Sequence, residues 1–316
     1  MVVMVSVVIP LYNGREYIER SIASVLQQTC QDFEIVVVDD GSVDGGPEYV
    51  LRLNHPKIRV VRQPNGGVSA ARNRGIREAR HGLIAFLDAD DEWLPSHLET
   101  LLRLYHRYPS CGVFGTSYYM QRGNEEPVLP VLPCPFTFSG GEGILDNYFR
   151  LASGRDFPMQ TSAFAVRKET ILAVGGFPEG IPSGEDILTL ARLCSVSDMA
   201  YSRQPTSIYY LTAGAGKSVR RILEHDPLDA MFEAVRAASP HKDGSRLFLA
   251  SWYKRRMSGA MLARKYGLGM RMFWKSFRVL PFQRKLYTSF AVTVFASLTG
   301  LKLYDINKFL SKCRRS

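Results

Sequence analysis

Short apolar segments alternate with amphipathic helical stretches along the first 210 residues of this 316-residue chain. The apolar segments are rich in β-branched residues and too short to be helices, which is typical of buried strands. We predict strands at residues 5–10, 33–40, 57–61 and 83–88, and helices at residues 15–28 and 68–79. Such alternation indicates a Rossmann-like α/β fold, with a mostly parallel sheet and helices on both of its faces.

Polar residues stand where three of these predicted strands end. They are Tyr12 and Asn13 after the first strand, Asp39 and Asp40 at the second, and Asp88, Asp90 and Asp91 at the fourth. In open parallel sheets, ligands bind in the crevice at the carboxyl ends of the strands. We therefore expect these three segments to meet in one crevice.

The acidic cluster of Asp88, Asp90 and Asp91 lies directly after an apolar strand, in the sequence LIAFLDADDEW. Carboxylates this close together repel one another unless a cation or water offsets their charge. Oxygen-rich clusters suit Mg²⁺ or Mn²⁺, which take one or two carboxylates together with substrate phosphates. The alternative is a solvated acidic turn that caps the next helix, and these residues alone leave both open.

Residues 65–76, NGGVSAARNRGI, open with two glycines and run into a predicted helix that carries Arg72. A helix N-terminus with an arginine is a natural phosphate site, although solvated arginines are commoner on helices. The segment has neither the GxxxxGK[ST] nor the GxGxxG pattern, so neither a P-loop nucleotidase nor a dinucleotide oxidoreductase is supported.

A further predicted helix, residues 183–193, begins with Glu185 and Asp186. Carboxylates in a first turn commonly serve only to offset the helix dipole. Close to a phosphate-bearing substrate, either could instead act as a general base toward a hydroxyl group. Between the two halves, the Pro- and Gly-rich residues 120–138 predict a loop or a lid.

Five segments, taken in order, resemble family 2 inverting glycosyltransferases of the GT-A fold. They are VSVVIPLYNGREYIERSIASVLQQT, FEIVVVDDGSVD, NGGVSAARNRGI, GLIAFLDADDEWLP and GEDILTLARL. The resemblance covers about the first 210 residues and does not reach the remainder. It implies a catalytic domain at residues 1–210. Beyond it, amphipathic helical segments predict a basic, mostly helical C-terminal region at residues 211–316.

The resemblance also implies a role for each matching residue. For the nucleoside, Pro10, Tyr12 and Asn13 would lie against it, Asp40 would bind the uracil edge, and Asp39 would shape that pocket. Arg72 would reach the base or diphosphate, Asp88 would face the donor, and Asp90 with Asp88 would hold Mn²⁺ or Mg²⁺. Asp186 would be the base, with Glu185 beside it. Many relatives carry an Arg or His further along, where this chain offers only Lys217. Lys217 would then assist the diphosphate as a point charge.

The implied reaction is a metal-dependent, inverting transfer of a sugar from a UDP-sugar to a hydroxyl acceptor. The acceptor would be a lipid-linked or cell-surface polysaccharide precursor. One alternative is transfer to a polyprenyl phosphate, which needs no strong base. Another is a noncatalytic protein that binds nucleotide sugars or membranes, against which stands the joint presence of Asp40, Asp88, Asp90 and Asp186.

Positive charge is concentrated at the end of the chain. Residues 246–316 hold sixteen basic residues and one acidic residue, whereas the whole chain carries a net charge of +10. Basic segments with aromatic anchors favour the surface of an anionic membrane, and nucleic acid is a less favoured partner because no nucleic-acid motif accompanies them. The alternative is that these helices only pack on the catalytic domain.

The cysteines predict the compartment. The five cysteines form no CxxC pair, which favours a reducing compartment over a disulfide framework or a zinc site. The apolar start of the chain is read as a strand and not as a signal peptide. We therefore expect a cytoplasmic protein on the inner face of the membrane.

Overall fold

The computed structural model describes residues 3–211 and 223–299. Within these residues, one nine-stranded sheet has the order β3-β2-β1-β4-β8-β6-β9-β5, and β7 pairs with β9. The strands are β1 Val5–Leu11, β2 Phe33–Asp39, β3 Ile58–Arg62, β4 Leu83–Phe86, β5 Glu92–Trp93, β6 Val113–Gln121, β7 Glu142–Ile144, β8 Phe164–Arg167 and β9 Met199–Tyr210. The predicted α/β fold is confirmed, with helices around a central sheet.

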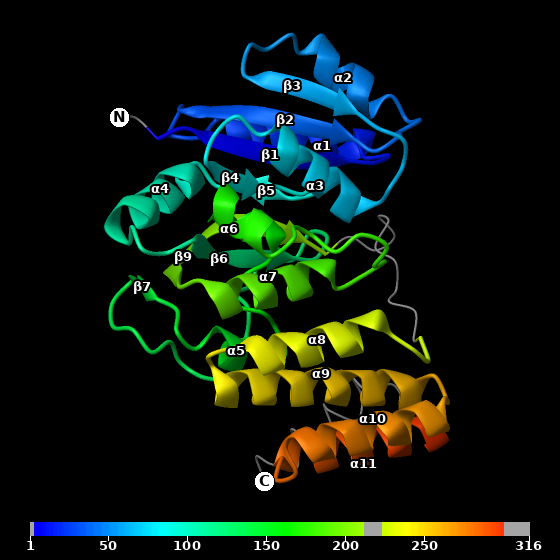
Figure 1. Ribbon diagram of the computed structural model, residues 1–316. Helices are drawn as coiled ribbons and strands as arrows, with labels where there is room; N and C mark the ends of the chain where they lie inside the picture. The colour runs from blue at the N-terminus through cyan, green and yellow to red at the C-terminus, as the bar shows by residue number, and fades with distance from the viewer. Residues whose placement is uncertain (1–2, 212–222, 300–316) are drawn as a thin grey trace.

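The helices fall into two groups, those that surround the sheet and those that follow it in the chain. They are α1 Arg15–Leu26, α2 Gly46–Arg52, α3 Val68–Glu78, α4 His97–Arg107, α5 Tyr148–Leu151, α6 Lys168–Ala173, α7 Glu185–Val196, α8 Pro227–Ala238, α9 Lys242–Leu262, α10 Tyr266–Val279 and α11 Arg284–Thr299. Figure 1 shows α8 to α11 stacked beyond α7, at the end of the molecule opposite β3. The predicted helical character of the C-terminal part is confirmed from α8 to α11.

The first half of the sheet matches the prediction closely. β1 pairs in parallel with both β2 and β4, and β2 pairs in parallel with β3. All seven residues of β1 and all seven of β2 are buried, as expected for strands covered on both faces. The carboxyl ends of β1, β2 and β4 therefore lie at one edge of the sheet, together with the polar residues that follow them.

The second half of the sheet is mixed in direction, which the sequence pattern does not predict. β8 runs antiparallel to β4 and to β6, whereas β6 and β9 are parallel. A continuously apolar strand is buried on both faces whichever way it runs, so its composition carries no signal for direction. The segment at residues 120–138 begins with the end of β6 and is otherwise irregular, joined by one bridge between Met120 and Val128. Its predicted role as a lid stays a prediction.

The C-terminal helices share a hydrophobic core with the sheet domain. One continuous cluster contains Val8 and Phe86 from the sheet as well as Phe232, Phe248 and Leu286 from the helices. A boundary near residue 210 stays a prediction, because apolar packing is continuous across it. Among residues 3–211 and 223–299, no helix is both long and apolar enough to cross a membrane.

Candidate active site

A cavity of about 460 Å³ lies at the carboxyl ends of β1, β2 and β4, beside the first turns of α3. Seven of the predicted site residues line it: Pro10, Tyr12, Asn13, Asp40, Arg72, Asp88 and Asp90. Tyr17, Asn65 and Gly67 also contribute to the wall. The structure thus brings together residues from four separate segments of the chain.

The loops after β1 and β2 are fastened to each other at the mouth of this cavity. The backbone N–H of Asn13 donates to Ser42 Oγ at 3.1 Å, and the N–H of Val43 donates to Asn13 Oδ1 at 2.9 Å. Asn13 adopts a φ of 47°, a left-handed conformation that Asn tolerates better than most residues. The side chain of Asn13 therefore holds the loop, while Tyr12 is 56% exposed and offers its ring to a ligand.

Asp40 is buried and organises the glycine loop before α3. Its Oδ1 accepts hydrogen bonds from Gln63 Nε2 at 2.7 Å and from the N–H of Gly66 at 2.9 Å, and its Oδ2 accepts from the N–H of Gly67 at 2.8 Å. Gly67 has a φ of 87°, which a side chain would strain. A carboxylate offers about four acceptor positions, so Oδ2 keeps one for a ligand.

Asp39 does not line the cavity and supports it from behind. Its Oδ1 accepts from the N–H of Ser42 at 2.9 Å, and its Oδ2 lies 3.7 Å from Arg62 Nε. These contacts fix the turn that follows β2. This placement is compatible with the predicted role of shaping the pocket.

Arg72 is buried and joins the two halves of the site. Its two terminal nitrogens contact Asp88 Oδ1 at 2.7 Å and Glu185 Oε1 at 3.1 Å, and its guanidinium lies 5.0 Å from the centre of the Phe177 ring. Burial lowers the pKa of Arg72, but the attraction of Asp88 and Glu185 outweighs burial and raises it overall. This cation is therefore permanent, and it fixes α7 against the end of β4.

Asp88 and Asp90 are the two carboxylates that the sequence proposes as ligands for a divalent cation. Both line the cavity, and the side chain of Asp88 remains 23% exposed beside Arg72. Arg20 binds the backbone carbonyl of Asp90 at 2.5 Å and so fixes this turn. Residues 3–211 and 223–299 contain no group of three or more His, Cys, Asp or Glu side chains that could hold a metal. Two carboxylates still fit Mg²⁺ or Mn²⁺, because these ions take remaining ligands from water and phosphate.

Asp91 has a structural position, and it contacts a residue that sequence reasoning missed. Asp91 is fully buried, and its oxygens accept from Ser162 Oγ at 2.6 Å and from the N–H of Tyr210 at 3.2 Å. Ser162 Oγ also accepts from the N–H of Asp88 at 3.0 Å. Nothing in the sequence pattern singles out Ser162, because its contacts lie more than 70 residues away along the chain.

Asp186 lies at the start of α7, beside Glu185. The contacts of Arg72 with Asp88 and Glu185 are called the Arg72 bridge below. Burial and the neighbouring Glu185 raise the pKa of Asp186 to about 6, even though Arg72 opposes this shift. A carboxylate with this pKa is ionised at neutral pH and remains a usable proton acceptor. Glu185 is engaged by Arg72, so Asp186 is the carboxylate better placed to act as a base. Lys217 lies outside the described residues.

Parts of this chain are similar in sequence to known proteins. Residues 6–165 match the family described as Glycosyl transferase family 2. The uncharacterized glycosyltransferase EpsJ of Bacillus subtilis (strain 168) is 37% identical over 132 residues, which are 41% of this chain and 38% of that protein. Chondroitin synthase of Pasteurella multocida (strain Pm70) is 38% identical over 102 residues, 32% of this chain and 11% of that protein. The chain thus spans well under half the length of these relatives.

The fold of this chain is similar to that of a solved structure. The crystal structure of S. aureus TarS 1–349 in complex with UDP-GlcNAc superimposes with a TM-score of 0.70 at 16% identity, covering 94% of this chain and 92% of that chain. At this identity the likeness shows the fold alone. The matched residues 6–165 span half of the chain and include the cavity from Pro10 to Asp90, so the chain belongs to glycosyl transferase family 2.

Proposed function

We propose that this protein is an inverting glycosyltransferase that moves a sugar from a UDP-sugar to a hydroxyl group of an acceptor. The observation that carries the proposal is the cavity in which Tyr12, Asp40, Arg72, Asp88 and Asp90 gather, with Asp186 beyond the Arg72 bridge. Family membership supports the reaction class. The complexes of TarS with UDP-GlcNAc and with UDP support a nucleotide-sugar donor.

The donor would bind at the carboxyl ends of β1 and β2. Tyr12 offers an exposed ring on which a uracil base can stack, and Asp40 Oδ2 keeps an acceptor position for a base N–H. Val68 opens α3 at the cavity wall, so the helix N-terminus favours the negative diphosphate. The buried Arg72 adds a permanent positive charge at the same place.

Asp88 and Asp90 would hold Mn²⁺ or Mg²⁺. When bound, such an ion would offset the negative charge that grows on the departing diphosphate. The contribution of the chain is to keep these carboxylates in place, through Arg72 for Asp88 and through Arg20 for the backbone at Asp90. Lys217 is proposed as a further charge near the diphosphate.

Asp186 would take the proton from the attacking hydroxyl group of the acceptor. A carboxylate at this place supports a hydroxyl acceptor over a polyprenyl phosphate, because a phosphate is already ionised and needs no base. One in-line displacement then inverts the anomeric carbon, and no protein nucleophile is required. We propose a lipid-linked or cell-surface polysaccharide precursor as acceptor, with the protein held on the inner face of a membrane by its basic helices.

The test is UDP release from a panel of UDP-sugars, with and without acceptors, in Mn²⁺, Mg²⁺ or EDTA. We expect Asp186→Asn to lower the transfer rate by about 10² to 10⁴-fold while donor affinity is unchanged. In the parent protein, the rate should fall about tenfold per pH unit below pH 6, as Asp186 gains a proton.

Folding of the Asp186→Asn variant is expected to be intact. A carboxyl group whose pKa is raised on folding destabilises the folded state once pH exceeds that pKa, so the neutral amide relieves this cost at pH 7. Full transfer rate in Asp186→Asn would refute the base assignment. Failure of every UDP-sugar to bind would refute the donor.

A further inference from the structure

A second cavity, far from the donor residues in the sequence, is lined by cations. It has a volume of about 810 Å³ and lies between the segment after α5, the middle of α9 and the start of α11. We call it the basic groove, and its cationic residues are Arg150, Arg155, Lys254, Arg255, Arg284 and Lys285. Its lining in the described residues includes no Asp or Glu.

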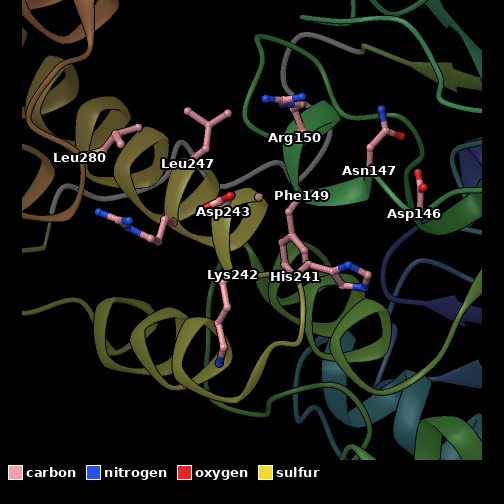
Figure 2. A pocket seen from close by; sticks show the side chains of 11 residues that line it. Asp146, Asn147, Phe149, Arg150, His241, Lys242, Asp243, Leu247 and Leu280 are labelled. Atoms are coloured by element: carbon pink, nitrogen blue, oxygen red, sulfur yellow. The ribbon is translucent and has the colours of Figure 1, made fainter.

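A neighbouring cavity of about 670 Å³ shares Arg150, Leu247 and Leu280 with the basic groove but has a different charge balance. Asp146 and Asp243 lie among its lining residues, as Figure 2 shows. Lys242 points away from Arg150 in that view and donates to the carbonyl of Ala237 at 3.0 Å. Carboxylates therefore line this cavity, whereas none lines the basic groove.

Lys254 and Arg255 are the partly buried cations of the basic groove, whereas Arg150, Arg155, Arg284 and Lys285 are exposed. Burial lowers the pKa of Lys254, and the charges of Arg255 and Lys285 lower it further. Arg255 donates to the carbonyl of Ala152 at 3.0 Å, yet its other terminal nitrogen is buried with no hydrogen bond. Such a set of cations favours an anion, and the planar guanidinium group matches phosphate in particular.

One carboxylate beside the groove, Asp156, offsets part of its positive charge, because it lies near Arg155 and attracts Arg255. Asp156 Oδ1 is 3.8 Å from Arg155 Nε, and its Oδ2 accepts from the N–H of Val131 at 2.8 Å. In the described residues, no ion pair is formed by Lys254, Arg284 or Lys285. Arg284 and Lys285 also open α11, where the helix dipole disfavours cations unless an anion is bound.

An exposed aromatic residue at the groove distinguishes a lipid from a small anion. Phe282 lines the groove and is 96% exposed. Trp274, Tyr287 and Phe295, on α10 and α11, are also at least 44% exposed. Aromatic side chains beside cations are the pattern by which a protein lies in the interface of an anionic leaflet.

We propose that the basic groove binds the phosphate headgroup of an anionic phospholipid, with Phe282 inserted among the lipids beside it. This inference deepens the membrane attachment in the proposed function and is independent of the sugar-transfer chemistry. It assigns attachment to one built site, whereas the charge of the C-terminal region alone predicts only a diffuse attraction.

The test is flotation with phosphatidylcholine vesicles that contain or lack phosphatidylglycerol. Arg284→Gln with Lys285→Gln removes two charges inside the groove, and Arg271→Gln with Arg278→Gln removes two charges from α10 outside its lining. A diffuse attraction predicts equal losses, since each cation contributes about 1 kcal/mol, or roughly fivefold. We expect the groove pair to lower the partition coefficient at least tenfold more than the α10 pair.

Phe282→Ser leaves the charge unchanged and alters an exposed side chain, so folding should be unaffected. We expect it to weaken binding to phosphatidylglycerol vesicles severalfold. Equal losses in the two charge pairs, or no effect of Phe282→Ser, would overturn the proposal. So would saturation of the groove by inorganic phosphate with no vesicle binding, which would assign it to a free phosphate compound.

UDP release without vesicles separates this inference from the proposed function. The groove variants should release UDP at the rate of the parent protein, because no groove residue lines the donor cavity. If the parent protein proves inactive with every UDP-sugar, the flotation result still decides whether lipid binds in the groove.

Discussion

Arg72 has a buried guanidinium that contacts two carboxylates, Asp88, 16 residues further along the chain, and Glu185, 113 residues further along. Its planar fork reaches Asp88 and Glu185 at the same time, which a single ammonium group cannot do with the same geometry. The contacts therefore serve both the donor side of the site and the helix that carries Asp186. At this position, the two contacts require the planar shape of the guanidinium as well as its positive charge.

Arg72→Lys should lower the free energy of unfolding by about 3 kcal/mol, because it leaves a buried carboxylate without its partner. Urea unfolding measures this loss. Arg74→Lys is the matched control on the same helix, since Arg74 is 41% exposed and pairs with Glu78 only at the surface. That control should cost less than about 1 kcal/mol. Comparable losses in the two variants would show that the contacts of Arg72 contribute no more to stability than the surface pair of Arg74.

At the scale of elements, α3 is placed by its close contact with β1. A Cβ atom added at Gly75 would lie 2.2 Å from Val8 Cγ1 and 3.0 Å from Val8 Cγ2. Val8 is fully buried in a strand with neighbours on both sides, so it cannot move away freely. The absence of a side chain at Gly75 thus sets how near Arg72 comes to the strand ends.

Gly75→Ala should destabilise the protein by about 1–3 kcal/mol through overpacking and should also weaken UDP binding, because α3 carries part of the cavity wall. Gly267→Ala is the control, since α10 has open space at that position. The control should be neutral or slightly stabilising, as Ala favours helices more than Gly does. Denaturant unfolding and UDP titration of both variants measure the two effects. A Gly75→Ala protein with unchanged stability would contradict the contact.

The parts of the fold that the sequence predicts are those with a local signal. β1, β2, β4, α1 and α3 have clear periodicity, and the acids at the strand ends follow from the parallel arrangement. The sequence does not predict β9 along its twelve residues, because this strand mixes buried and exposed positions without regular alternation. The structural positions of Asn13 and Asp91 depend on hydrogen bonds to distant segments, for which sequence spacing gives no signal.

At the scale of the whole molecule, the sheet and the C-terminal helices are packed as one body. Phe149 of α5, which lies between β7 and β8 in the chain, contacts Phe248 of α9 with ring centres 5.7 Å apart, and Phe232 of α8 contacts the same ring at 5.2 Å. The helix that carries Asp186 packs against α8. α8 thus supports the proposed base from behind, and α8 in turn packs against the basic helix α9.

A shared core predicts that the two regions unfold together. Trp93 is buried in β5 of the sheet, and Trp252 is buried in α9. Replacing Trp274 and one of these two by Phe leaves a single tryptophan, whose fluorescence reports the unfolding of the region around it. In each single-tryptophan variant, the urea midpoint from fluorescence should equal the midpoint from far-ultraviolet circular dichroism. Two separate midpoints in either variant would show that residues 1–210 and the helices are independent domains.

The Arg72 bridge also limits how this protein can be recombined with its relatives. The family match ends at residue 165, so Glu185 lies in the part of the chain beyond the matched residues. A chimera joined between these points would keep Arg72 and receive a foreign α7. Unless the incoming helix supplies a carboxylate at the position of Glu185, the chimera inherits a buried cation with half of its partners, whatever acceptor its new half recognises.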